Sequence, residues 1–186
     1  MSGQNEQKQV NLWFVWNYER EQQRLDRLSA AGLHLTKPGK FWSSYTQDDA
    51  RRFTYRLDYQ PALQNAPARR DYLDLYQAAG WAHIGDCMHW HYFRREWSPD
   101  KPAEIYTDRD SLKWLYRRIR RVLGVVFIAE LPALLINIIN INLLTQRGKL
   151  PLWPITATIV LLVAVMLLLG YGFLAMTRKI RAIDNG

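Results

Sequence analysis

Two spacings of hydrophobic residues alternate along residues 10–97. Leu12–Trp16 and Arg52–Tyr59 have the composition and alternation of strands, whereas Tyr18–Ala31 and Arg69–Ala79 carry apolar residues at helical spacing. Further strands are expected at Leu33–Thr36, Phe41–Thr46, Trp81–Ile84 and Met88–Arg94. The pattern predicts an α+β domain in which the order strand, helix, strand, strand occurs twice.

The two halves also resemble each other in sequence. Ala30-Ala31-Gly32-Leu33 matches Ala78-Ala79-Gly80-Trp81, and in both halves the glycine stands where a helix is expected to stop. Two βαββ halves would form a mostly antiparallel sheet with both helices on one face. The opposite face would then be polar or available to a partner.

Two long apolar segments follow, at residues 122–144 and 154–176. Each is long enough, at about 1.5 Å per helical residue, to cross the ~30 Å hydrocarbon core of a bilayer. Between Val122 and Met176 the charged residues are Glu130, Arg147 and Lys149. We therefore predict a transmembrane hairpin whose external loop is residues 145–153.

The remaining segments are expected to be short. They are a disordered N-terminus at 1–9, a linker at 98–110, a basic juxtamembrane helix at 111–121 and a basic tail at 177–186. Basic residues concentrate on the cytoplasmic side of membrane helices, and interfacial tryptophans anchor them. The expected anchors are Trp114, Arg117, Arg118, Arg120, Arg121, Trp153, Arg178, Lys179 and Arg181. This distribution predicts a two-span protein of the cell membrane, with both termini in the cytoplasm.

Charge changes the picture less than its total suggests. The net charge is +8, yet residues 1–108 contain 14 basic and 14 acidic residues. The excess therefore lies beside the membrane spans, and we expect no nucleic-acid partner. The single cysteine, Cys87, excludes a disulfide framework, and the first ten residues have no secretion-signal pattern. Both observations favour a cytoplasmic domain.

Several motifs occur in a recognisable order: WNYERE at 16–21, AAGLHL at 30–35, FTYRLDYQP at 53–61, YLDLYQAAGW at 72–81 and WHYFRR at 90–95. On these motifs, residues 10–97 resemble an uncharacterised family of bacterial membrane proteins. The resemblance implies a cytoplasmic domain of unknown function, followed by transmembrane helices in the bacterial inner membrane. Because members are often encoded beside PadR-type transcriptional regulators, it also implies a regulatory or signalling role.

One group of residues has the composition of a metal site. Cys87, His89 and His91 would share one face of a strand, with His83 as a further candidate on the adjacent strand, and thiolate and imidazole suit zinc. The alternative is a hairpin whose polar residues face solvent. We favour the hairpin and expect no metal and no cofactor.

The first apolar segment contains an unusual polar stripe made of Glu130, Asn137 and Asn140. A carboxylate inside hydrocarbon is costly and normally faces protein or water. The stripe would pack against the second span, assemble a homo-oligomer, contact a membrane partner, or sense protonation. We favour packing or oligomerisation over sensing.

The sequence has no phosphate-binding loop, nucleophile elbow or zincin helix, and we expect no catalytic residues. Its carboxylates, such as Asp58, Asp71, Asp74 and Asp86, show no spacing typical of a catalytic pair. We therefore expect a non-enzymatic membrane protein whose cytoplasmic domain binds a protein partner. The alternatives are an accessory subunit of a transport or envelope complex, engaged through the hairpin, and a membrane-surface enzyme supported only by the Cys/His group.

Overall fold

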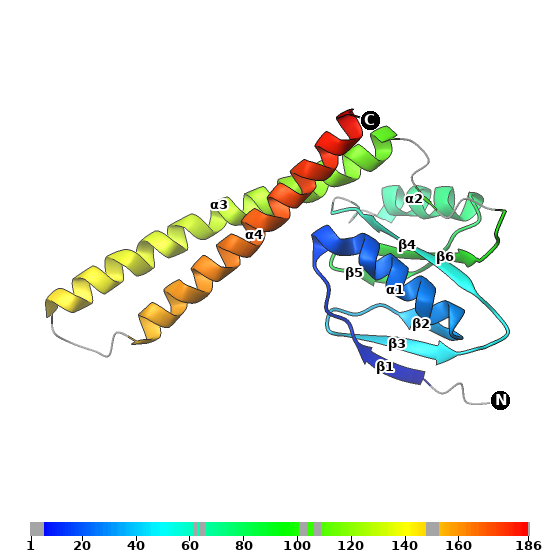
Figure 1. Ribbon diagram of the computed structural model, residues 1–186, viewed down its shortest axis with the longest axis horizontal. Helices are drawn as coiled ribbons and strands as arrows, with labels where there is room; N and C mark the ends of the chain where they lie inside the picture. Colours follow the sequence, from blue (N-terminus) through cyan, green and yellow to red (C-terminus); the bar gives the residue numbers. More distant parts are fainter. Residues whose placement is uncertain are drawn as a thin grey trace. The chain divides into compact units, whose positions relative to one another are not determined.

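The structure is a computed structural model that describes residues 6–61, 63, 66–100, 104–105, 109–147 and 153–185. The chain divides into two compact units, Met1–Asp108 and Arg109–Gly186, which are considered separately below (Figure 1).

The first unit contains two successive βαββ modules. The first is built from β1 (Glu6–Val10), α1 (Tyr18–Ala30), β2 (Leu33–Lys37) and β3 (Trp42–Gln47), with a short 3-10 helix, η1 (Val15–Asn17), before α1. The second is built from β4 (Phe53–Tyr59), α2 (Ala66–Ala78), β5 (Ala82–Cys87) and β6 (Trp90–Glu96). The predicted α+β class and the doubled order of elements are confirmed.

The two modules share one topology. Each forms a three-stranded antiparallel sheet, in the order β1-β3-β2 and β4-β6-β5. Each sheet has a register shift in its second strand, between Leu35 and Lys37 and between His83 and Gly85. Gly32 and Gly80 end their helices with φ of 79° and 81°, a left-handed conformation that glycine adopts without steric cost. The internal repeat is therefore structural.

The first strand is displaced from its predicted position. Residues 12–16 form no strand, and η1 places Trp16 in the core instead. β1 lies at Glu6–Val10, mostly within the stretch 1–9 that we expected to be disordered, and residues 1–5 of that stretch lie outside the described residues. Its sequence, EQKQV, is polar, so hydrophobic alternation does not reveal it. Backbone pairing with β3 holds it in place.

Helix α1 covers the free edge of β4. Ser29, Asp26 and Gln22 lie one helical turn apart and contact the backbone of Phe53, Tyr55 and Leu57, which are spaced two apart on the strand. Ser29 Oγ accepts from the Phe53 amide at 2.7 Å, and Asp26 Oδ1 accepts from the Tyr55 amide at 2.6 Å. An open strand edge is thus satisfied by side chains.

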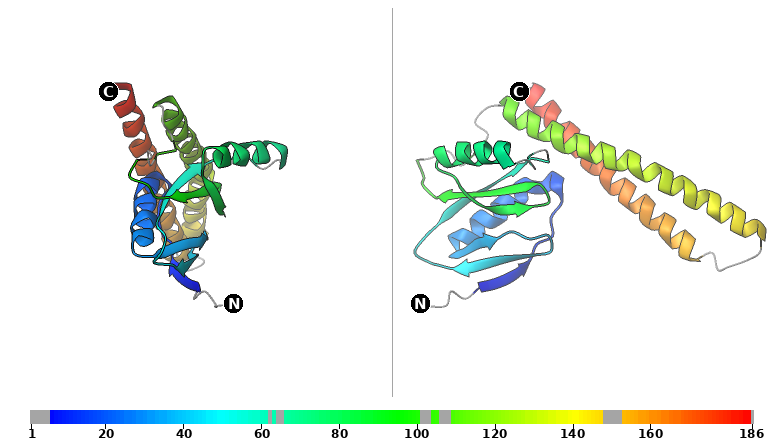
Figure 2. Two further views of the ribbon diagram at one scale, coloured as in Figure 1. Left: turned by 90° about the vertical axis from the view of Figure 1, so that its right-hand side faces the viewer. Right: turned by 180° about the vertical axis from the view of Figure 1, so that it is seen from behind.

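The two helices do not share a face of the second sheet (Figure 2). Tyr18 of α1 stacks on Trp90 of β6, whereas Tyr76 of α2 stacks on Phe93, which lies an odd number of residues further along the same strand. Because side chains alternate between faces, these contacts lie on opposite sides. We expected both helices on one face because a sheet usually has a polar face open to solvent. Instead, β4 is buried on both faces, including the face that carries its polar residues, so a helix covers each face.

The second unit consists of two long helices, α3 (Arg109–Arg147) and α4 (Trp153–Asn185). The predicted juxtamembrane helix and first span are one continuous helix, and the predicted tail continues α4. Buried contacts lie near the basic end and come from Leu115, Ile119, Leu123, Met176 and Ile180. Residues 148–152 of the predicted external loop lie outside the described residues.

Both helices are long and apolar enough to span a membrane. In the most apolar 18-residue stretch of each helix, 6% of α3 and 11% of α4 is buried within the structure. A soluble protein would bury such surfaces, whereas lipid solvates them. The structure is consistent with a two-span membrane protein.

Candidate functional site

A row of ionisable residues crosses the second sheet on the face that α2 covers. His91 on the central strand β6 is paired with Asp58 on β4 and with Asp86 on β5. Directly paired residues project to the same face, so the imidazole lies between two carboxylates. The sequence scatters these residues, and strand pairing brings them together.

Asp58 is fully buried and forms the inner end of the row. Its Oδ2 accepts hydrogen bonds from the hydroxyls of Tyr72 and Tyr76 on α2, at 2.7 and 3.1 Å, and from Gln60 Nε2 at 3.0 Å. Three donors on one carboxylate oxygen offset much of the cost of burying its charge. This network docks α2 on the sheet.

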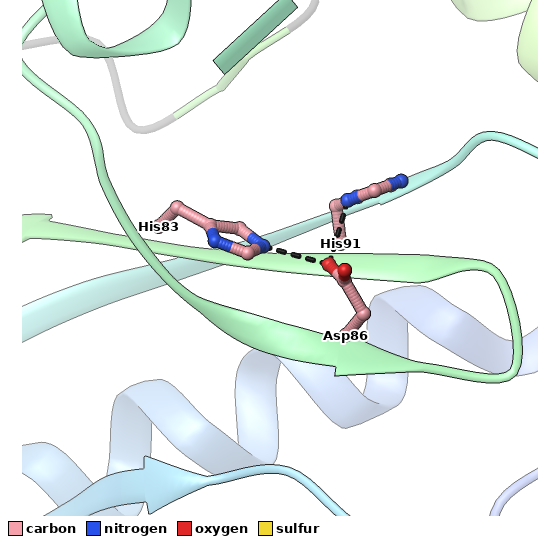
Figure 3. A group of neighbouring side chains, drawn as sticks. All are labelled: His83, Asp86 and His91. Carbon is pink, nitrogen blue, oxygen red and sulfur yellow. Dashed lines mark hydrogen bonds and ion pairs between the residues drawn. The ribbon is translucent and has the colours of Figure 1, made fainter. Parts of the chain in front are cut away.

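The outer end of the row is the His83–Asp86–His91 cluster (Figure 3). His83 Nε2 and His91 Nδ1 each lie 2.7 Å from Oδ1 of Asp86. The second carboxylate oxygen, Oδ2, accepts from Arg69 Nη2 at 2.5 Å. His91 is buried, whereas the other members are partly exposed. The cluster is therefore open on one side and enclosed on the other.

The surroundings set the protonation of the cluster. Burial, with smaller contributions from His83 and Arg69, lowers the pKa of His91 below its usual value, although the carboxylates of Asp86 and Asp58 act in the opposite direction. Burial opposes ionisation of Asp86, but hydrogen bonds from His83 and Arg69, together with the charge interactions of His91 and His83, hold the pKa of Asp86 below its usual value. Around neutral pH this environment favours a neutral His91 imidazole beside an Asp86 carboxylate.

The predicted Cys87, His89 and His91 group does not lie on one strand. β5 ends at Cys87, Met88 and His89 form the turn, and β6 begins at Trp90. Met88 and His89 have φ of 49° and 68°, as the central residues of a tight hairpin turn require. The two-residue alternation that we expected to align the three side chains is therefore interrupted. Burial raises the pKa of the Cys87 thiol.

Sequence reasoning passed over Asp86 because we assigned it to the turn. With the turn at Met88 and His89, Asp86 becomes the direct partner of His91. A hairpin centred between these two residues would have revealed the pairing, but Met is uncommon at positive φ and the turn contains no glycine or asparagine.

The residues of the predicted intramembrane stripe all lie on α3. Glu130 is half-buried, and Asn140 is exposed. Asn137 Nδ2 donates to the Ala133 carbonyl one turn earlier, at 2.8 Å. The Asn137 side chain therefore uses one of its donors within its own helix, and Asn140 presents an amide to the surroundings.

The expected anchors lie at the ends of the two long helices. Trp114 and Trp153 are exposed, Arg117 lies over the Trp114 ring, and Lys179 lies over the Tyr116 ring at 5.3 Å. Lys113 also pairs with Asp184 between α3 and α4. The other predicted anchors, Arg118, Arg120, Arg121, Arg178 and Arg181, occupy the same basic end of these helices.

An exposed apolar surface lies at one end of the first sheet. We call it the β1–β3 patch: Val10, Leu12, Phe41 and Trp42, which are 50, 76, 55 and 62% exposed. Val10 and Trp42 are direct cross-strand partners, and the Asn11 amide donates to the Phe41 carbonyl at 2.8 Å. Four exposed apolar residues on adjoining positions indicate an interaction surface.

Three exposed lysines accompany the β1–β3 patch. Lys8 and Lys37 are both paired with Ser44 of β3, two residues along the strand from the pair of Val10 and Trp42. Lys40 Nζ lies 5.2 Å from the centre of the Phe41 ring. The surface therefore combines apolar side chains with positive charge.

The comparisons with known proteins identify the family of the chain. No curated protein and no solved structure matches the chain. The model of a family described as "Protein of unknown function (DUF2812)" matches residues 17–128, which is more than half of the 186 residues and extends from η1 into the first long apolar helix. The chain therefore belongs to the DUF2812 family.

Proposed function

We propose that this chain is a non-enzymatic, two-span membrane protein whose first unit binds a protein partner through the β1–β3 patch. The supporting observation is the patch itself. Val10, Leu12, Phe41 and Trp42 are each at least half exposed, in a unit that buries most of its other aromatic residues. Such a surface is costly to leave in water, and a bound partner removes that cost.

The lysines define the chemistry of the partner. Lys8, Lys37 and Lys40 would attract acidic side chains, while the apolar residues would receive an apolar segment. The occupant is thus an apolar protein segment flanked by acidic residues. Resemblance to the bacterial family encoded beside PadR-type regulators favours a transcriptional regulator, or a protein acting on one, as the owner of that segment.

A photo-crosslinking amino acid at Trp42 of the full chain, expressed in its own membrane, tests this proposal. The crosslinked protein is identified, purified and titrated against the chain in nanodiscs. We expect Trp42→Ala to weaken binding at least about tenfold, the scale of an interface hot spot. Leu75→Ala is the matched control, because Leu75 is 69% exposed on α2, outside the patch.

Crosslinks to lipid alone, or to a second copy of the chain, would refute the proposed occupant. So would a purified partner that binds the Trp42→Ala and wild-type chains equally well.

The proposed location is the bacterial inner membrane, with both termini in the cytoplasm. The basic residues at the start of α3 and the end of α4 support this orientation. Cys87→Ser gives a cysteine-free chain into which single cysteines are introduced at positions 3, 149 and 185. A membrane-impermeant maleimide added to intact spheroplasts should label position 149 and spare positions 3 and 185, and the reverse pattern would refute the orientation.

Asn140 supports a second candidate function, in which the hairpin joins a membrane transport or envelope complex. Its exposed amide, with the half-buried Glu130 on the same helix, would hydrogen-bond a partner helix. Under this alternative, Glu130→Gln combined with Asn140→Leu should release the partner, while Trp42→Ala should leave it bound.

A further inference from the structure

Three potential metal ligands converge at the open end of the second sheet. The ligating atoms of His83, Asp86 and His91 all lie within 4.8 Å of one another, and Figure 3 shows one ring nitrogen of each histidine joined by a dashed line to the Asp86 carboxylate. β5 supplies two of the side chains and β6 supplies the third. The register shift between His83 and Gly85 brings His83 and Asp86 to the same side of β5.

One ring nitrogen of the cluster makes no hydrogen bond to the part of the chain that the structure describes. His91 is 4% exposed, and its Nδ1 lies 2.7 Å from Asp86 Oδ1, but the approach does not have the angle of a hydrogen bond. Nδ1 thus has no hydrogen-bond partner among the described residues. A buried ring nitrogen without a hydrogen bond is unusual in a native structure. It leaves the lone pair of His91 Nδ1 available to a ligand that enters the cluster.

The spacing suits a small cation. Tetrahedral zinc binds nitrogen and oxygen at about 2.0–2.2 Å, which places neighbouring ligand atoms about 3.3–3.5 Å apart. Both nitrogens now lie 2.7 Å from Asp86 Oδ1. Metal binding would widen these two gaps by less than about 1 Å, a change that side-chain rotation can supply.

The surroundings of the cluster also suit a metal. Arg69 holds Asp86 Oδ2 and leaves Oδ1 for the ion, and Tyr72 packs on the His91 ring with 5.1 Å between the ring centres. Such outer contacts orient metal ligands. A groove of about 630 Å³ between α2 and β5 is lined in part by His83 and gives solvent access. A water molecule would complete the coordination from that side.

We infer that His83, Asp86 and His91 bind one divalent transition-metal ion of the zinc class. Two imidazoles and one carboxylate form a ligand set that suits such ions better than Mg²⁺ or Ca²⁺, which favour oxygen ligands. The ion would tie β5 to β6 beside α2. This inference is independent of the proposed protein partner.

The test is a titration of the tag-free full chain, in detergent, with Zn²⁺ against a chromogenic chelator. We expect one ion per chain and a Tm that rises with Zn²⁺ concentration. His83→Ala and Asp86→Asn should each weaken Zn²⁺ binding at least about 100-fold, because each removes one of three protein ligands. His83 and Asp86 are partly exposed, and the far-ultraviolet circular dichroism spectrum shows whether these variants still fold.

The chain supplies its own control in Cys87 and His89, which lie beside the cluster but outside it. The double variant Cys87→Ser/His89→Ala should bind Zn²⁺ within about threefold of wild type, and the Co²⁺ complex should lack a thiolate charge-transfer band. Absence of saturable Zn²⁺ binding by the wild-type chain would overturn the inference. Binding that survives His83→Ala and Asp86→Asn, or that is lost with Cys87 and His89, would overturn it as well.

Discussion

Asp26 of α1 contacts both the backbone and the side chain at the edge of β4: its Oδ1 accepts the Tyr55 amide at 2.6 Å, and its Oδ2 lies 2.8 Å from Arg56 Nη1. The Arg56 side chain is 8% exposed. One carboxylate therefore satisfies an open strand edge and neutralises a largely buried guanidinium. Glu104 also approaches Arg56, at 3.4 Å, but its side chain is mostly exposed.

Asp26→Ala is expected to lower the free energy of unfolding by about 2–4 kcal/mol, because it leaves the Tyr55 amide without its acceptor and a buried guanidinium with only the exposed Glu104. Asp26→Asn should cost less, since the amide oxygen can still accept from Tyr55. Urea unfolding of the full chain in detergent, followed by tryptophan fluorescence, measures both. Asp74→Asn on the exposed side of α2 is the control, and equal losses in Asp26→Ala and Asp74→Asn would contradict the edge-covering role.

The hydroxyls of Tyr72 and Tyr76 are expected to act together on Asp58. Tyr72→Phe should cost about 1.5–3 kcal/mol, because it removes a 2.7 Å hydrogen bond to a buried carboxylate. Tyr76→Phe, at 3.1 Å, should cost less. The double variant should depart from additivity, since both donors share one oxygen. Hydrogen exchange along α2 provides the readout, and unchanged protection in the double variant would rule out docking through Asp58.

Three buried tyrosines predict a limit to stability at alkaline pH. Burial raises the pKa of Tyr45, Tyr55 and Tyr92 above the usual 10.0. Because the folded state favours the neutral phenol, their contribution is fully present below about pH 10 and is lost as pH rises through their raised folded-state values. Tyrosinate absorbance and near-ultraviolet circular dichroism should change together above that pH. Ionisation of these three tyrosines near pH 10 in a chain that stays folded would contradict the prediction.

The paired glycines provide an internal comparison. Gly32→Ala and Gly80→Ala should each cost about 1 kcal/mol, because alanine is strained at φ near 80°. Gly32→Ala should cost more, since a Cβ there overlaps the Asp49 carboxylate and displaces Gln47, whereas a Cβ at Gly80 meets only the Arg95 Cδ at 3.8 Å. Thermal unfolding of both variants measures the difference. A larger loss at Gly80 would show that this close approach is unimportant.

The sequence predicts those parts of the fold that depend on apolar spacing and on glycine. Both helices, both glycine stops and the doubled βαββ order follow from such local signals, as do the two long apolar helices. β1 escaped prediction because EQKQV has no apolar alternation and depends on its partner strand. The opposite placement of α1 and α2 escaped because Arg56 and Asp58 are polar yet buried.

Prediction of the His83–Asp86–His91 cluster from the sequence required the correct position of one turn. Its three residues were all visible in the sequence, but their convergence depends on the position of the turn at Met88 and His89 and on the register that follows from it. A shift of one residue sends every side chain of a strand to the other face. Spacing in a single strand therefore could not identify the partners of His91.

The covering of β4 by α1 also bears on how the first unit folds. Ser29, Asp26 and Gln22 belong to the first repeat, and the edge that they cover belongs to the second. Neither repeat is complete without the other, although each has its own sheet. The repeats should consequently melt in a single cooperative transition, and a chain cut between β3 and β4 should regain structure only when both fragments are mixed.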